Sequence, residues 1–193
     1  MRIKVVGQDP SMNNWGLAAA YVDLETFEID VIEIEVIVNL KKDISTNKNV
    51  RRNSLDIERT KDLNRGIQAF LNKHDPVCTM IEVPHGAQSF SSGKGMGICL
   101  GLLGAQSFNM IQLSERECKI SAIGKNKGTK KEVIEWAMGN HPNANWKMKK
   151  SNGVLVSTDG YNEHAADAVA AINAGLLTDQ FMSIAAIYKK ILK

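Results

Sequence analysis

The segment from Glu28 to Ile37 alternates acidic residues with β-branched ones almost without a break. A period of two residues is typical of a β-strand with one buried and one solvated face. Two apolar runs precede this segment and are joined by a short polar turn. We therefore expect three consecutive strands, at 2–8, 15–22 and about 28–38, with the acids of the third facing solvent.

Helical spacing replaces this alternation after a polar, aperiodic stretch at 39–50, which predicts a loop. Apolar residues then recur with an approximately helical spacing from Leu55 to Leu71, and Pro76 stops the predicted helix. The compact apolar run at 77–81 predicts a buried strand. Three consecutive strands, followed by strands and helices in alternation, predict an α/β fold with a mixed sheet. Further helices are predicted at 95–109, 129–139, 161–176 and 179–192.

The composition limits the class of protein. A length of 193 residues suits one domain, and the 44% hydrophobic and 23% charged fractions exclude a wholly disordered chain. The three cysteines show no Cys-x-x-Cys spacing, so we expect reduced thiols rather than a disulfide or zinc framework. No apolar stretch approaches the roughly 20 residues that span a bilayer, and a polar turn comes too early for a signal peptide. These features predict a soluble, cytoplasmic protein.

Acidic residues stand at the ends of two predicted strands. Asp9 ends the first strand in front of a proline, and Glu82 directly follows the strand at 77–81. Where such strands are parallel neighbours, their ends line one edge of the sheet, at which ligands usually bind. In the Ala-rich segment 161–171, His164 and Asp167 have i,i+3 spacing and share a helix face. Small side chains would let this helix lie close to the sheet and bring that face near the strand ends.

The four side chains suit metal-assisted phosphodiester hydrolysis. Carboxylates of Asp9, Glu82 and Asp167 with the imidazole of His164 could hold two Mg²⁺ or Mn²⁺ ions, which activate water and stabilise the leaving oxygen. Each residue also has a simpler interpretation. Asp9 with Pro10 can form an Asx-turn, Glu82 can cap a loop, and the His-x-x-Asp pair can lie on the surface. The occurrence of all four residues together, in this order along the chain, favours the metal site.

In this order, the motifs resemble those of the RuvC-type Holliday junction resolvases, in the ribonuclease H-like superfamily. The resemblance covers about residues 2–176 and implies a ribonuclease H-like fold, with a mixed central β-sheet flanked by α-helices. We expect a single nuclease domain over 1–193, with a C-terminal helix at about 179–192. The motifs that carry the resemblance are Gly7-Gln8-Asp9-Pro10 with Gly16, Ile81-Glu82, and His164-Ala165-Ala166-Asp167-Ala168. Two further matching segments are Gly93 to Phe108, like the family's intervening helix, and Ile123 to Val133, like its basic loop.

The resemblance also implies roles for particular residues. Asp9, Glu82, His164 and Asp167 become metal-binding catalytic residues for two Mg²⁺ or Mn²⁺ ions, and Lys130, or its neighbour Lys131, a lysine near the scissile phosphate. His85 falls near the position from which an aromatic side chain of the family can stack on junction bases, and Phe90 is another candidate for that role. The chain departs from the family pattern at Gln8, Ser11 and Trp15, at His164 in place of a frequent aspartate, and in a longer stretch at 142–160.

Charge placement points to a nucleic-acid partner independently of the motifs. The net charge is only +3, but five lysines fall between Lys119 and Lys131, and three more between Lys147 and Lys150. Lysine-rich loops provide sequence-independent phosphate contacts. The alternative is a merely solvated surface. The predicted nucleic-acid contacts are Lys125, Lys127, Lys130, Lys131, Lys147, Lys149, Lys150, His85 and Phe90.

The leading hypothesis is a homodimeric, Mg²⁺-dependent, structure-selective DNA endonuclease that nicks four-way junctions in pairs. It would act in a bacterial cell or a phage-infected host, without a membrane partner. Two alternatives stay open. One is a nuclease of the same superfamily that cuts branched DNA generally, or RNA. The other, of a different class, is a non-catalytic nucleic-acid-binding module.

Overall fold

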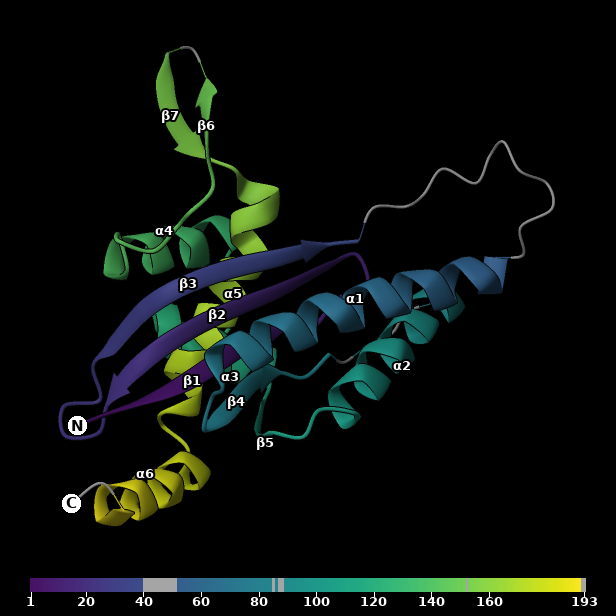
Figure 1. Ribbon diagram of the computed structural model, residues 1–193. Coiled ribbons are helices and arrows are strands. Elements are labelled where there is room, and N and C mark those ends of the chain that lie inside the picture. Colours follow the sequence, from purple (N-terminus) through teal and green to yellow (C-terminus); the bar gives the residue numbers. More distant parts are fainter. Residues whose placement is uncertain (40–51, 85, 87–88, 152, 192–193) are drawn as a thin grey trace.

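Five strands form the central sheet of the computed structural model, which describes residues 1–39, 52–84, 86, 89–151 and 153–191. The sheet order is β3-β2-β1-β4-β5 (Figure 1). β1, β2 and β3 pair antiparallel, whereas β4 pairs parallel with both β1 and β5. The predicted mixed sheet is therefore confirmed. The strands are β1 (Arg2–Asp9), β2 (Asn14–Asp23), β3 (Ile29–Val38), β4 (Cys78–Glu82) and β5 (Asn109–Leu113).

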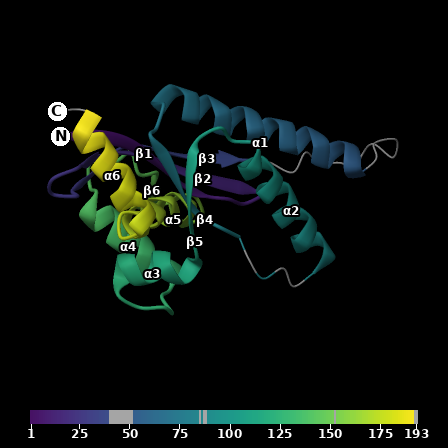
Figure 2. The same ribbon diagram turned by 90° about the horizontal axis from the view of Figure 1, so that it is seen from below.

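Helices cover both faces of the sheet (Figures 1 and 2). One apolar core lies between the sheet and helices α1 (Arg52–His74) and α2 (Phe90–Gly104). A larger core lies on the other face, under α3 (Glu115–Ile123), α4 (Lys130–Asn140) and α5 (Asp159–Gly175). The last helix, α6 (Asp179–Ile191), adds the buried Phe181 to this second core.

No single helix in the described residues is long and apolar enough to cross a bilayer. α5 and α6 would meet that test only as a pair, but a bend of 72° separates them. The apolar residues of α5 are buried in the core of the protein.

α5 lies directly against the sheet because two strand positions carry no side chain. A Cβ atom at Gly7 in β1 would collide with the carbonyl oxygen of Ala168. A Cβ atom at Gly16 in β2 would collide with the carbonyl oxygen of His164. Glycine is therefore required at both positions to let the helix backbone approach, and this contact fixes where α5 crosses the sheet.

A register shift in β3 changes the predicted alternation. Between Ala19 and Ala20 of β2, the pairing on β3 skips Ile32, which is 40% exposed. Asp30 and Glu35 face solvent as predicted, but Glu33 is half-buried and contacts Lys73 and His74 of α1. The expectation of a solvent-facing acid is wrong for Glu33. The bulge keeps Glu33 on the same face as Asp30 and Glu35, but the end of α1 covers that face at Glu33.

Several boundaries differ from the sequence predictions. The helix expected at 95–109 begins at Phe90, where Ser89 and Ser92 form a reciprocal capping box, and ends at Gly104. β5 and α3 were not predicted, although Ser114 and Glu117 form the same kind of cap at the start of α3. The stretch at 142–160 contains an unpredicted hairpin, β6 (Met148–Ser151) and β7 (Val154–Ser157). The loop predicted at 39–50 lies outside the described residues, apart from its first residue.

Candidate metal and nucleic-acid site

Asp9 and Glu82 end the neighbouring parallel strands β1 and β4, so both stand at the same edge of the sheet. α5 brings His164 and Asp167 to this edge. The Nδ1 atom of His164 lies 2.7 Å from Oδ2 of Asp9. Asp9 pairs across the sheet with Gly16, the glycine that lets the backbone at His164 approach. The fold thus brings all four predicted residues to one edge and places Asp9 and His164 in direct contact.

Acidic side chains lie close together at this edge, and burial and their mutual repulsion raise the pKa values of two of them. Burial raises the pKa of Glu82 to about 7, and the charges of Asp9 and Glu115 add to the effect. Burial also raises the pKa of Asp167, reinforced by the charges of Asp9 and Glu82. Burial and the repulsion between neighbouring acids both disfavour the ionised carboxyl groups, and positive charge close to them would offset this. A divalent cation would supply that charge.

His164 supplies part of this positive charge. Burial of its ring opposes protonation, but the hydrogen bond to Asp9 and the charges of Asp9 and Glu163 outweigh burial and raise the pKa of His164. When its ring is protonated, His164 forms an ion pair with Asp9. A metal ligand must be neutral at the coordinating nitrogen, so metal binding at His164 would release this proton.

The donor set fits Mg²⁺ or Mn²⁺, which bind carboxylate oxygens. Across the residues that the structure describes, no three His, Cys, Asp or Glu side chains are already arranged to share an ion. Asp9, Glu82, Asp167 and His164 would be the residues that hold it. The side chains would have to move to bring the donors together on an ion.

Two lysines border the acids, and sequence reasoning identified only one of them. Lys130, at the start of α4, forms an ion pair with Glu163, and the charges of Asp167 and Asp9 further raise its pKa. Lys131 instead pairs with Glu135 at 3.6 Å on the exposed side of α4. Of the two predicted alternatives, Lys130 is the lysine beside the acids.

Lys119 is the lysine that sequence reasoning missed. It is partly buried in α3 and pairs with Glu115. That hydrogen bond raises its pKa, and the charges of Asp167 and Glu82 add to the effect. Lys119 belongs to the predicted lysine cluster, but without the α3 prediction nothing indicated which way it faces.

A thiol also contacts the acids. Cys118 is buried in α3, and its hydrogen bond with Glu82 lowers the pKa of that carboxyl against the larger effect of burial. The pKa of the Cys118 thiol is itself raised by burial and by the charge of Glu82. Cys78, Cys99 and Cys118 are all free, as predicted.

Two of the departures from the family pattern contact each other beneath Asp9. The Nε1 atom of Trp15 donates to Oε1 of Gln8 at 3.2 Å, and both side chains are buried. The amide of Gln8 also donates to Oε1 of Gln106 at 2.8 Å. A buried amide needs such partners, so Gln8 is accommodated only together with Trp15 and Gln106.

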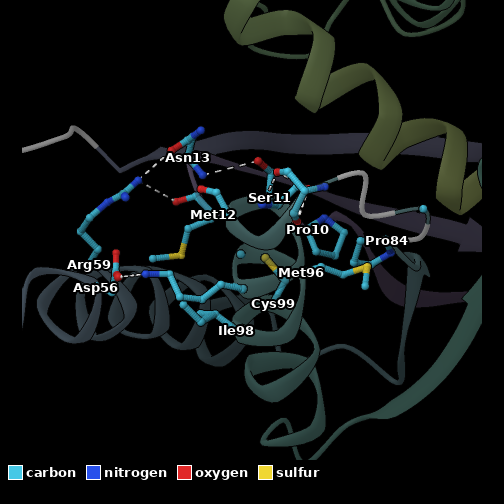
Figure 3. A pocket seen from close by; sticks show the side chains of 16 residues that line it. Pro10, Ser11, Met12, Asn13, Asp56, Arg59, Pro84, Met96, Ile98 and Cys99 are labelled. Atoms are coloured by element: carbon cyan, nitrogen blue, oxygen red, sulfur yellow. Dashed lines mark hydrogen bonds and ion pairs between the residues drawn. The ribbon is translucent and has the colours of Figure 1, made fainter. Parts of the chain in front are cut away.

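A cleft of about 720 Å³ begins at Pro10, the residue after Asp9 (Figure 3). Arg59 of α1 lines it and donates to Oδ1 of Asn13 at 2.7 Å, and Lys94 of α2 pairs with Asp56. The cleft thus combines cationic groups with hydroxyls next to the acids. The hydroxyls are those of Ser11, Ser89, Ser91 and Ser92.

The other predicted nucleic-acid residues that the structure describes lie on the surface. Phe90 is 89% exposed at the start of α2. Lys125 pairs with Glu132 at 2.7 Å, and Lys127 is exposed between α3 and α4. Lys147 lies over the ring of Tyr161, at 4.7 Å from its centroid. Lys149 and Lys150 are exposed on β6, and His85 lies outside the described residues.

Comparison with known proteins supports the fold. No family model and no curated protein matches the chain. RuvC of T. thermophilus in complex with a Holliday junction substrate is similar in structure, with 17% identity and a TM-score of 0.63 over 94% of this chain and 96% of that one. A second Thermus thermophilus RuvC structure gives 17% identity and a TM-score of 0.57, over 94% and 97% of the two chains. The chain therefore has a RuvC-like, ribonuclease H-like fold, as its motifs predicted.

Proposed function

We propose that this protein is a divalent-metal-dependent DNA endonuclease that resolves four-way junctions by paired nicking. The observation that carries the proposal is the convergence of Asp9, Glu82, His164 and Asp167 at one sheet edge, where burial and neighbouring carboxylates raise the pKa values of Glu82 and Asp167. The RuvC-like fold over nearly the whole chain supports the substrate class, because one similar structure is a RuvC bound to a Holliday junction.

Each residue of the site has a distinct part in this proposal. Asp9, Glu82, His164 and Asp167 would hold two Mg²⁺ or Mn²⁺ ions, which supply an activated water and stabilise the leaving oxygen of the phosphodiester. Lys130 is three-quarters exposed, so its ammonium group can leave Glu163 and contact the phosphate.

The surroundings of the acids suit a DNA strand. The cleft beside Pro10 offers Arg59, Lys94 and several hydroxyls to a sugar-phosphate chain that leaves the acids on one side. The exposed ring of Phe90 lies in the helix turn that follows Ser89, a residue of the cleft wall, where an unstacked base could lie on it. We further propose a homodimer, because two symmetric strands of a junction require two active sites related by a two-fold axis.

The deciding experiment compares a four-way junction, a flap, a linear duplex and an RNA–DNA hybrid, each with Mg²⁺, Mn²⁺ or a chelator. We expect symmetric nicks in the junction that need a divalent cation and disappear in Asp9→Asn. The matched control is Asp30→Asn, an exposed acid of β3, which should cut as the wild type does. Equal cutting of all four substrates would instead indicate the broader nuclease.

A non-catalytic nucleic-acid-binding module is the alternative from another class. It predicts that the protein binds junctions but never cuts them, and that Mn²⁺ binding is undiminished in Glu82→Gln. Calorimetric titration of Mn²⁺ into wild type, Glu82→Gln and the surface control Glu135→Gln separates the two. Loss of binding in Glu82→Gln alone supports the metal site.

A further inference from the structure

The hairpin of β6 and β7 projects away from the body of the protein beyond the sheet (Figure 1). All four residues of β6 are exposed, and so are the first two of β7. A two-stranded hairpin without a third layer is marginally stable in water. Its persistence and its orientation therefore depend on how its base is held.

The base of the hairpin is fastened to the first turn of α5. The buried side chain of Asn162 accepts a hydrogen bond from the backbone N–H of Lys147 at 3.0 Å and donates to the carbonyl of Lys147 at 2.8 Å. It also donates to Oγ of Ser157 at 2.9 Å, so one amide joins both arms. Asn162 precedes His164 by two residues. The hairpin and the proposed catalytic helix are thus held as one unit.

Charge and apolar surface occur together on the hairpin. From Lys147 to Ser157 the sequence contains three lysines and no acid. Near the turn, Val154 and Leu155 are 63% and 62% exposed. Leu155 pairs with Lys150 across the strands, so a large apolar side chain and an ammonium group share one face.

We propose that this hairpin is a DNA-binding arm that recognises the branch point, where base stacking is interrupted. Lys149 and Lys150 contact phosphates, and Val154 and Leu155 insert against the exposed base faces at the branch. Apolar side chains that enter between base steps are a known means of binding unstacked DNA. This inference rests on the proposed function, and it adds the part of the molecule that distinguishes a branch from a continuous duplex.

The charge favours nucleic acid over other occupants. A purely apolar contact with a second protein would be served by Val154 and Leu155 without flanking lysines and would not require the absence of acids. The base of the arm is also connected to the proposed site, because Asn162, which holds both ends of the hairpin, lies two residues before His164 on α5.

The test uses two variants of the full chain and two matched controls. The tip variant is Val154→Ser with Leu155→Ser, and its control is Ile187→Ser, an exposed apolar residue of α6. The arm variant is Lys149→Gln with Lys150→Gln, and its control is Lys61→Gln, an exposed lysine of α1. Binding to a four-way junction and to a linear duplex of equal length is measured by fluorescence anisotropy with a chelator present. A 2-aminopurine at the branch reports base unstacking.

We expect the tip variant to bind the junction about tenfold more weakly, to keep its duplex affinity, and to lose the 2-aminopurine signal. The arm variant should bind both DNAs more weakly, and the slope of log K against the logarithm of salt concentration should become less steep by about two. Unchanged junction binding and unchanged 2-aminopurine fluorescence in the tip variant would overturn the inference. A tip variant altered only in its sedimentation or in its binding to anionic vesicles would overturn it too.

Failure of this inference is separable from failure of the proposed function. The binding readouts need no cleavage, so a protein that never cuts junctions can still show the tip effect. Conversely, a wild type and a tip variant that cut and bind junctions equally would disprove only the role of the hairpin.

Discussion

At the scale of single residues, the raised pKa of Glu82 gives a specific prediction about the site. Burial raises its pKa to about 7, and the charge of Asp9 is the next contribution. The folded protein therefore holds the Glu82 proton more tightly than the unfolded chain does. Its contribution to stability is complete below its ordinary pKa of 4.5 and is lost as the pH rises through about 7.

Replacing this carboxyl should stabilise the metal-free protein only at high pH. With a chelator present at about pH 8, we expect Glu82→Gln to be more stable than the wild type by up to roughly 3 kcal/mol, and nearly equal to it at about pH 4.5. Denaturant unfolding at both pH values measures this difference. Glu135→Gln, an exposed acid, should show no such pH dependence, and a constant offset for Glu82→Gln would contradict the prediction.

The position of some site residues could be predicted from the sequence, and that of others could not. Asp9 and Glu82 could be placed because strand ends are visible in the pattern, and parallel neighbours share an edge. Lys119 and Cys118 could not, because they lie on a helix of nine residues whose only signal is its capping box. Gln8 and Trp15 departed from the family pattern for a reason that only the fold reveals, their contact with each other.

Among the elements, the contact of α5 with the sheet decides the position of His164. Because a Cβ atom at Gly16 would collide with the His164 carbonyl, Gly16→Ala must push the first turns of α5 away from β2. We expect a loss of about 1–3 kcal/mol in the free energy of unfolding and weaker Mn²⁺ binding. Gly97→Ala is the control, since a Cβ atom there meets open space inside α2, and it should gain up to about 1 kcal/mol.

Calorimetric Mn²⁺ titration and denaturant unfolding of both variants check this prediction. A Gly16→Ala protein with wild-type metal affinity would show that the helix position is not what brings His164 to Asp9. The close approach was predicted from the alanines of α5, but the two glycines that permit it were noted only as motif residues. Their role depends on the crossing point of helix and strands, which periodicity does not give.

For the whole molecule, a total charge of +3 says little, because the placement of the lysines matters more, and eight of the eighteen fall between Lys119 and Lys150. The mixed sheet and the position of Asp9 and Glu82 at strand ends could be predicted from apolar patterns, whereas β5 and the order of the strands could not. The hairpin could not be predicted either, because its strands have four residues each and expose both faces. Short exposed elements leave no burial pattern in the sequence.

The homodimer is the prediction that belongs to the whole molecule. Two nicks at symmetric positions need two active sites related by a two-fold axis, and a chain of 21.2 kDa holds one such site. Sedimentation should therefore give about twice this mass at concentrations where junctions are cut. Dimers of one wild-type and one Asp9→Asn chain should nick a plasmid cruciform once and leave an open circle, whereas wild-type dimers should give linear DNA. A protein that is monomeric when fully active would contradict the paired mechanism, because two independent monomers would accumulate open circles before any linear product.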